Sequence, residues 1–212
     1  MRCFVIGNGI SLQAADLDLI TGQPSIACNR INLVYPDTKW RPTVYVHPET
    51  TLLDLHHIQE SVDLGIPCYL GELYQTHIKD APNITWIKDC HHHLINFDNP
   101  DVLDEWHLPQ LCSFGGSVNV ATQVATKLGF DDIILLGCDL LYRNGKGKSH
   151  FHKDYETGEE MSAFYASHNA LWGHITALNY IRRKMKNVRV RNATRGGMLE
   201  IWERVTLDEV CQ

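Results

Sequence analysis

The fold is decided by residues 3–11, which read Cys-Phe-Val-Ile-Gly-Asn-Gly-Ile-Ser. The apolar run suits a buried strand, and Gly7 and Gly9 allow a tight turn in which main-chain N–H groups approach a ligand closely. Ser11 can cap a helix that begins there, and the N-terminus of a helix attracts an anion. The stretch therefore predicts a nucleotide site around Asn8, at the carboxyl end of a parallel strand.

Apolar runs and helical periodicities alternate along the rest of the chain. We expect strands over 2–6, 25–28, 43–46, 66–70, 85–87, 133–137 and 188–190, and helices over 11–20, 51–64, 117–128 and 161–185. Such alternation predicts an α/β fold with a doubly wound, mostly parallel sheet of the Rossmann-like kind. The length of 212 residues fits one domain spanning 1–212.

Composition limits the classes of partner. The formal net charge of −6 argues against general nucleic-acid binding, and no apolar run approaches the ~20 residues of a membrane span. No signal peptide is visible. The seven cysteines are odd in number and include no Cys-x-x-Cys pair, so we expect free thiols and a cytoplasmic protein. A homo-oligomer stays open.

Polar residues follow the predicted strands, where ligands of a parallel sheet bind. Taken singly, each of these residues could simply cap a loop. Together with the glycine turn and a second anion site at Gly116-Ser117, they make a nucleotide-binding set. Its members are Gly7, Asn8, Gly9, Ser11, Asn29, His47, Gly116, Ser117, Asn192 and Thr194.

A polar loop with several glycines covers residues 143–160 and is a candidate mobile lid. His150 and His152 flank Phe151 in it. A His-x-His pair needs a third ligand to hold a metal. Asp154 could supply one, but the sequence has no completing cluster at a recognised spacing, so we expect no metal site. Because imidazole titrates near neutrality, His152 is the better candidate for a general base.

These segments resemble the bacterial family 42 sialyltransferases. They also resemble a related group of archaeal 6-hydroxymethylpterin diphosphokinases and flagellin-modifying motility accessory proteins. The matching pieces occur in the family's order along most of the chain: 5–12, 28–30, 45–48, 116–130, 136–139 with Tyr142 close by, 149–155 and 192–194. The resemblance implies a fold that is a variant of the glycosyltransferase type A fold.

The resemblance also implies roles for single residues. Asn8 and Asn29 match asparagines that hold the nucleotide of a CMP-sugar donor, and Ser117 matches a serine at the phosphate or the sugar. Tyr142 stands near a tyrosine that stabilises the departing phosphate, and His152 matches the general base. With Asp139, these last two form the expected catalytic set. His47 stands where the sialyltransferases have an asparagine, which leaves the donor sugar open.

Three functions remain open at this stage. The first is a glycosyltransferase that moves a sugar from a nucleotide donor to a glycan or another hydroxyl acceptor, with no metal required. The second is a diphosphokinase that uses ATP, with Mg²⁺ on Asp139 and Glu49. The third is a nucleotide-binding module without catalysis.

Overall fold

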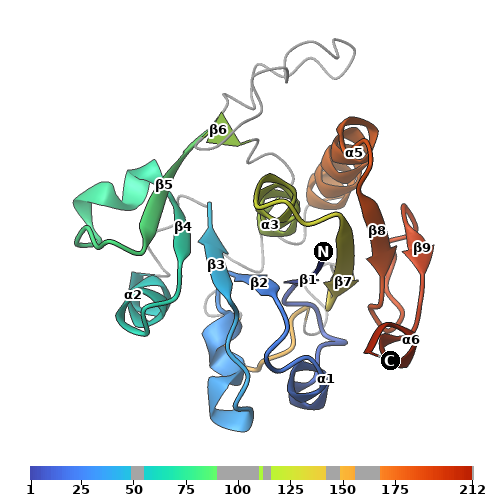
Figure 1. Ribbon diagram of the computed structural model, residues 1–212, viewed down its shortest axis with the longest axis horizontal. Helices are drawn as coiled ribbons and strands as arrows, with labels where there is room; N and C mark the ends of the chain where they lie inside the picture. Colours follow the sequence, from blue (N-terminus) through green and yellow to red (C-terminus); the bar gives the residue numbers. More distant parts are fainter. Residues whose placement is uncertain (49–54, 90–109, 112–115, 142–148, 156–167, 212) are drawn as a thin grey trace.

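The computed structural model describes residues 1–48, 55–89, 110–111, 116–141, 149–155 and 168–211 (Figure 1). Nine strands of these residues form one sheet in the order β6-β5-β4-β3-β2-β1-β7-β8-β9, and every pairing is parallel. The strands are β1 (Arg2–Ile6), β2 (Ser25–Cys28), β3 (Val44–His47), β4 (Cys68–Gly71), β5 (Ile84–Asp89), β6 (Gln110–Leu111), β7 (Asp132–Leu136), β8 (Arg189–Asn192) and β9 (Glu203–Arg204).

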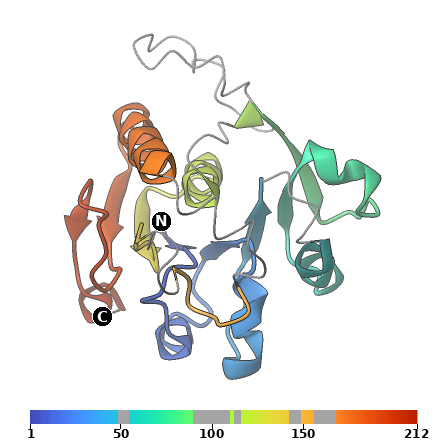
Figure 2. The ribbon, with the colours of Figure 1, turned by 180° about the vertical axis from the view of Figure 1, so that it is seen from behind.

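Helices cover both faces of the sheet, as Figures 1 and 2 show. One face carries α3 (Ser117–Lys127) and α5 (His168–Lys184). The other carries α1 (Ala14–Leu19), the 3₁₀ helix η1 (Ile31–Asp37), α2 (Leu55–Asp63) and α6 (Leu207–Cys211), while the 3₁₀ helix η3 (Glu72–Thr76) follows β4. The doubly wound parallel sheet predicted from the sequence is confirmed.

The two layers follow from the alternation of side chains along each strand. In β1, Phe4 and Ile6 are buried in the cluster that contains residues of α1, η1 and α2. Cys3 and Val5 are buried in the other cluster, with α3 and α5. A strand covered on both faces must be apolar throughout, which explains the continuous apolar run in this part of the sequence.

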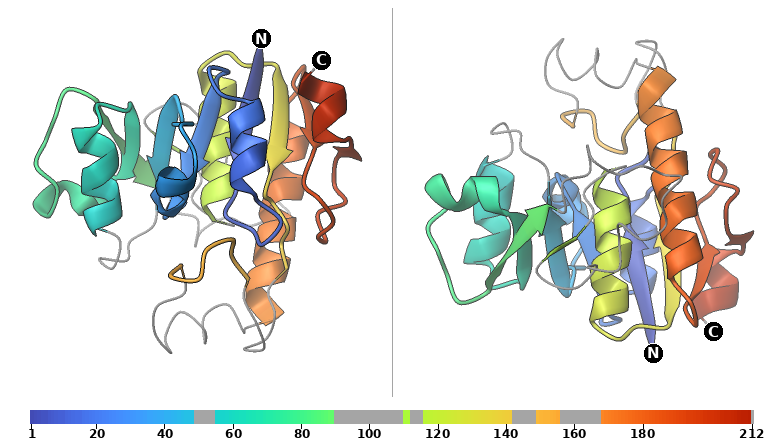
Figure 3. Two further views of the ribbon diagram at one scale, coloured as in Figure 1. Left: turned by 90° about the horizontal axis from the view of Figure 1, so that it is seen from below. Right: turned by 90° about the horizontal axis from the view of Figure 1, so that it is seen from above.

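The strand order reverses at β1. Ile6 pairs with Ala27 of β2 on one side and with Leu136 of β7 on the other. In a doubly wound sheet, a crevice opens outside the carboxyl ends of the strands at such a switch point, and ligands bind there. In both views of Figure 3, the described segment 149–155 lies beyond the edge of the sheet opposite to the N-terminus. The fold therefore brings the glycine turn and part of the predicted lid to the same edge.

The predicted strands are present, with ends shifted by up to a few residues. The helix expected over 51–64 is described from Leu55 and the one expected over 161–185 from His168. Five elements were not predicted, namely η1, η3, β6, β9 and α6. Of the predicted lid, only 149–155 is described.

Candidate active site

The turns that follow β1 and β7 pack against each other at the switch point. The main-chain N–H groups of Gly7 and Gly9 donate to the carbonyl oxygens of Leu136 and Gly137, each at 2.8 Å. A Cβ on Gly7 would lie 2.5 Å from the carbonyl oxygen of Gly137. The glycines predicted to bind a ligand are thus also required for this close contact between two main chains.

Asp139 is the charged residue of this contact and is 2% exposed. Its Oδ2 accepts hydrogen bonds from Ser11, at 2.8 Å from the hydroxyl Oγ and 3.4 Å from the main-chain nitrogen. Its Oδ1 is buried and has no hydrogen-bond partner. Burial raises the pKa of the Asp139 carboxyl, and the hydrogen bonds from Ser11 oppose that rise.

The prediction that Ser11 caps a helix is wrong. Helix α1 begins three residues later, at Ala14, and Asp16 Oδ2 accepts a hydrogen bond at 3.2 Å from the main chain of Gln13 in front of it. The Ser11 hydroxyl binds Asp139 instead. Helix α1 is thus short and displaced along the chain, and the predicted role of Ser11 in nucleotide binding stays a prediction.

Asn8 and Asn29 stand at neighbouring strand ends. The Asn8 amide nitrogen donates to the carbonyl oxygen of Cys28 at 2.9 Å, whereas its Oδ1 is buried without a partner. Asn29 has a left-handed main chain with φ of 53°, and its carbonyl oxygen accepts from the Tyr45 hydroxyl at 2.7 Å. These two hydrogen bonds link β1, β2 and β3 near their carboxyl ends. They leave the side-chain oxygen Oδ1 of Asn8 without a partner.

Helix α3 starts at the same place. Gly116 precedes it with φ of 84°, and the Ser117 hydroxyl donates to Asn29 Oδ1 at 2.8 Å. A Cβ on Gly116 would lie 2.5 Å from Cε1 of His174 in α5. Burial lowers the pKa of His174 to about 4, so this ring is neutral near pH 7. The structure thus brings Asn29 and Ser117 together, as expected of a common site.

His47 ends β3 and is fully buried. Its Nδ1 lies 3.3 Å from the hydroxyl of Tyr74 in η3, and the two rings meet edge to face with centroids 5.3 Å apart. The structure therefore places His47 against η3. Its predicted role in nucleotide binding stays a prediction.

Asn192 and Thr194 follow β8 and bind neighbouring parts of the chain. Asn192 accepts from the main-chain nitrogen of Thr194 at 3.0 Å and donates to the carbonyl oxygen of Leu199 at 2.9 Å. The Thr194 hydroxyl accepts from the main-chain nitrogen of Cys138 at 2.9 Å. These contacts hold the turn that carries Asp139 in place, which is a supporting task that the sequence did not reveal.

The segment 149–155 lies on the glycine turn, on the side of the sheet that carries α1 and η1 (Figure 2). Gly9 and His150 form an antiparallel bridge, and the main-chain nitrogen of Phe151 donates to the carbonyl oxygen of Asn8 at 3.1 Å. The His150 ring stacks on Tyr155 at 3.9 Å between centroids. Arg30, which follows β2, donates to the Tyr155 carbonyl oxygen. This part of the predicted lid is bound to the site.

His152 is the more accessible histidine of that segment, with 25% of its side chain exposed. Its Nδ1 accepts a hydrogen bond from the main-chain nitrogen of Asp154 at 3.2 Å. Two other predicted residues, Tyr142 and Glu49, lie outside the described part of the chain. Within that part, no cluster of three or more His, Cys, Asp or Glu side chains could hold a metal ion.

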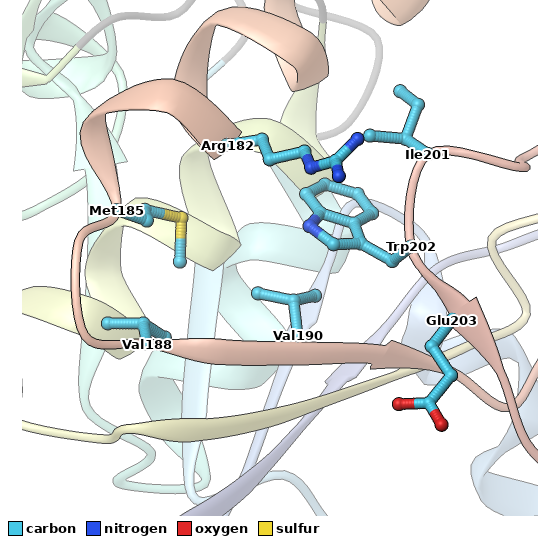
Figure 4. A pocket seen from close by; sticks show the side chains of 7 residues that line it. All are labelled: Arg182, Met185, Val188, Val190, Ile201, Trp202 and Glu203. Atoms are coloured by element: carbon cyan, nitrogen blue, oxygen red, sulfur yellow. The ribbon is translucent and has the colours of Figure 1, made fainter.

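A separate hollow of about 330 Å³ lies away from these strand ends. Figure 4 shows its lining at the end of α5, the start of β8 and the approach to β9: Arg182, Met185, Val188, Val190, Ile201, Trp202 and Glu203. None of the predicted site residues lines it.

No helix within the described ranges combines the length and the apolar character needed to cross a membrane.

Comparison with models of protein families finds no match, and comparison with curated proteins finds none either. Among solved structures, the chain is similar to the Maf glycosyltransferase from Magnetospirillum magneticum AMB-1, with a TM-score of 0.61 and 16% identity over 98% of this chain. It spans about a third of that protein, 34% of its length.

A second similar structure is the sialyltransferase CstII from Campylobacter jejuni, in complex with a substrate analogue, cytidine-5′-monophosphate. Its TM-score is 0.48 at 16% identity, over 96% of this chain and 84% of the sialyltransferase. The predicted resemblance is thus confirmed at the level of the fold, which this chain shares with the Maf glycosyltransferase.

Proposed function

We propose that the protein is a glycosyltransferase that moves a sugar from a nucleotide donor, of the CMP type by preference, to a hydroxyl acceptor. One observation carries the proposal. Asn8 Oδ1 and Asp139 Oδ1 are buried acceptor oxygens without partners, in the turns that follow the paired strands β1 and β7 at the switch point. Because buried polar atoms normally have partners, a bound ligand with N–H or O–H donors would complete them. The amino group of a base and the hydroxyls of a ribose are such donors.

The proposed reaction uses the catalytic residues that the family resemblance implies. His152 takes the proton of the acceptor hydroxyl, and the acceptor oxygen forms a bond to the anomeric carbon of the donor sugar. The bond between this carbon and the phosphate oxygen breaks, and its electron pair stays on the phosphate. Tyr142 and main-chain N–H groups stabilise the charge that develops there, so the proposal requires no metal. The shared fold with a protein described as a glycosyltransferase supports the reaction class.

The diphosphokinase remains the second candidate, because the unpaired Asp139 Oδ1 is also the kind of oxygen that Mg²⁺ binds. It would need Glu49 as a partner ligand. Dependence on Mg²⁺ separates the two reactions, and nucleotide binding without turnover would indicate a binding module.

Thermal unfolding in the presence of CMP, CDP, UDP, GDP or ATP, with and without Mg²⁺, tests the proposal. A ligand that binds the folded state alone raises the melting temperature. We expect CMP to raise it without Mg²⁺. Stabilisation by ATP alone, and only with Mg²⁺, would favour the kinase.

The variant Asn8→Ala tests the site itself. We expect it to weaken CMP binding by about 1–3 kcal/mol, because a buried hydrogen-bond partner is lost. Asn83→Ala is the matched control. The Asn83 amide also donates to main-chain carbonyl oxygens, at 2.8 and 3.1 Å, but Asn83 lies at the amino end of β5, whereas Asn8 follows the carboxyl end of β1. Equal CMP affinity in the two variants and the wild type would exclude this site.

A further inference from the structure

Charge is unevenly distributed along this chain. Residues 168–199 contain seven of the 19 lysines and arginines and none of the 25 aspartates and glutamates, although the formal net charge of the chain is −6. Three of these seven cations are paired with carboxylates of other segments: Arg189 with Glu203, Arg191 with Asp132 and Arg195 with Asp16. The other four lie at the carboxyl end of α5 and in the turn that leads to β8.

Three of those four, Arg182, Arg183 and Lys186, have exposed side chains and form a basic cluster. Within the described part of the chain, none of the three forms an ion pair. The basic cluster lies beside the hollow of about 330 Å³ described above. Arg182 lines this hollow, and Lys186 directly follows Met185, which lines it as well (Figure 4).

The hollow combines apolar walls with charged residues at the surface. Its walls include Met185 and Trp202, whose side chains are largely covered at 6% and 9% exposed. The exposed members of its lining are Arg182 and Glu203. Because Arg189 pairs with Glu203 at 3.0 Å, the charge left to attract a ligand is positive. The hollow therefore suits an apolar group that is flanked by negative charge.

We propose that the hollow and the basic cluster dock an acidic segment of a partner protein. One apolar side chain of that segment enters the hollow, and carboxylates on either side of it pair with the basic cluster. Guanidinium and ammonium groups bind carboxylates through charge-assisted hydrogen bonds, and burial of one large apolar side chain adds affinity. None of the predicted site residues lines the hollow, so the proposal does not depend on glycosyl transfer.

Three features favour a peptide over an anionic membrane or a nucleic acid. Proteins that lie on membranes insert apolar side chains that protrude, whereas the apolar side chains here form the walls of a hollow. Single-stranded nucleic acids stack their bases on aromatic rings, and Trp202 is only 9% exposed. The net charge of −6 opposes the approach of an extended polyanion, whereas a short segment interacts mainly with charges within about 10 Å.

Fluorescence anisotropy of labelled pentapeptides tests the proposal with the folded protein. The acidic probes carry Leu, Phe, Trp or Ser at the centre and two glutamates on each side. We expect at least one apolar probe to bind, and the serine probe to bind about tenfold more weakly, because it keeps the charge but lacks the apolar side chain. Absence of binding by every acidic probe overturns the proposal, and so does equal affinity for the serine probe and the apolar probes.

Variants that remove charge test the role of the basic cluster. In Arg182→Gln/Lys186→Gln, we expect the affinity for the apolar probes to fall about tenfold. Lys39→Gln/Lys79→Gln is the matched control, because it removes the same charge from two exposed lysines that follow η1 and η3, neither of which lines the hollow. Equal affinity in the two double variants overturns the proposal and leaves the cluster as a solvated helix end that the helix dipole favours.

Val188→Phe tests the hollow without a change of charge. The larger side chain occupies part of the cavity, so we expect the apolar probes to bind about tenfold more weakly, while the affinity for the serine probe stays the same. The melting temperature checks that this variant is folded. Unchanged affinity for the apolar probes in the folded variant overturns the proposal.

Two further probes identify a different kind of partner. Vesicles of phosphatidylglycerol and an oligothymidine strand are compared with the peptides under the same conditions, and we expect both to bind more weakly than the best apolar probe. Tighter binding of either one, lost in Arg182→Gln/Lys186→Gln, overturns the proposal in favour of a membrane or a nucleic acid.

Discussion

Replacing Gly9 by alanine should disrupt the contact between the two turns at the switch point. The main chain at Gly9 is outside the left-handed region, so the backbone angle alone would permit alanine. The added Cβ, however, would lie 1.8 Å from Asp139 Oδ2 and 2.7 Å from the carbonyl oxygen of Gly137. The carboxylate has to move, and its hydrogen bonds from Ser11 are then lost.

The size of the effect follows from these contacts. Overpacking costs about 1–3 kcal/mol, and a hydrogen bond to a charged group contributes about 1.5–3 kcal/mol. Because the two losses share one displacement, we expect Gly9→Ala to lower the free energy of unfolding by roughly 3 kcal/mol. For a chain of this size, that lowers the melting temperature by roughly 6–12 °C. Urea unfolding and thermal unfolding measure the two quantities.

Two further variants make the test specific. Gly22→Ala is the matched control, because Gly22 has φ of +83° and no atom within 4 Å of an added Cβ, so it should cost only about 1–2 kcal/mol of backbone strain. In an Asp139→Ala background, Gly9→Ala should cost roughly 1–2 kcal/mol less than in the wild type. An identical cost in both backgrounds would refute the contact between Gly9 and the carboxylate.

Three other predictions concern titration, thiols and catalysis. Burial lowers the pKa of His174 from 6.5 to about 4, so its contribution to stability is complete above pH 6.5 and is lost as the pH falls toward 4. The loss should reach roughly 3 kcal/mol in urea titrations, and His174→Gln should remove it. Burial raises the pKa of the thiols of Cys3, Cys68 and Cys138 to about 12, so Ellman's reagent should reach them only after unfolding. His152→Ala should lower turnover by ~10²–10⁴ with CMP affinity unchanged; a comparable loss of affinity would contradict the role as a base.

The fold could be predicted from the sequence because a buried parallel strand requires a continuous apolar run. β1, β2 and β7 were found for that reason. The two-residue strands β6 and β9 and the 3₁₀ helix η1 leave no such pattern, since they are too short or lack the helical period. The reversal of strand order at β1 is a property of the tertiary structure, and no local pattern encodes it.

The placement of several candidate site residues could be predicted for a related reason. Strands that run in parallel end at one edge, so Asn8, Asn29 and Asp139 were expected near one another. The sequence could not reveal the hydrogen bonds that these residues make within the chain, such as those of Asn192 with Thr194 and Leu199. It also could not reveal the contact of Gly9 with His150. The two partners are separated by 140 residues, and the sequence around one of them does not depend on the sequence around the other.

The central position of β1 has a consequence for the order in which the protein folds. Its pairing with β7 joins residues about 130 positions apart, as in Arg2 with Asp132. During synthesis, β1 therefore has one edge without a partner until β7 leaves the ribosome, and contacts of such long range slow folding. An apolar strand with an open edge is a template for pairing with other chains. Nascent chains that stop short of β7 should consequently depend on chaperones, whereas complete chains bury the same edge within the sheet.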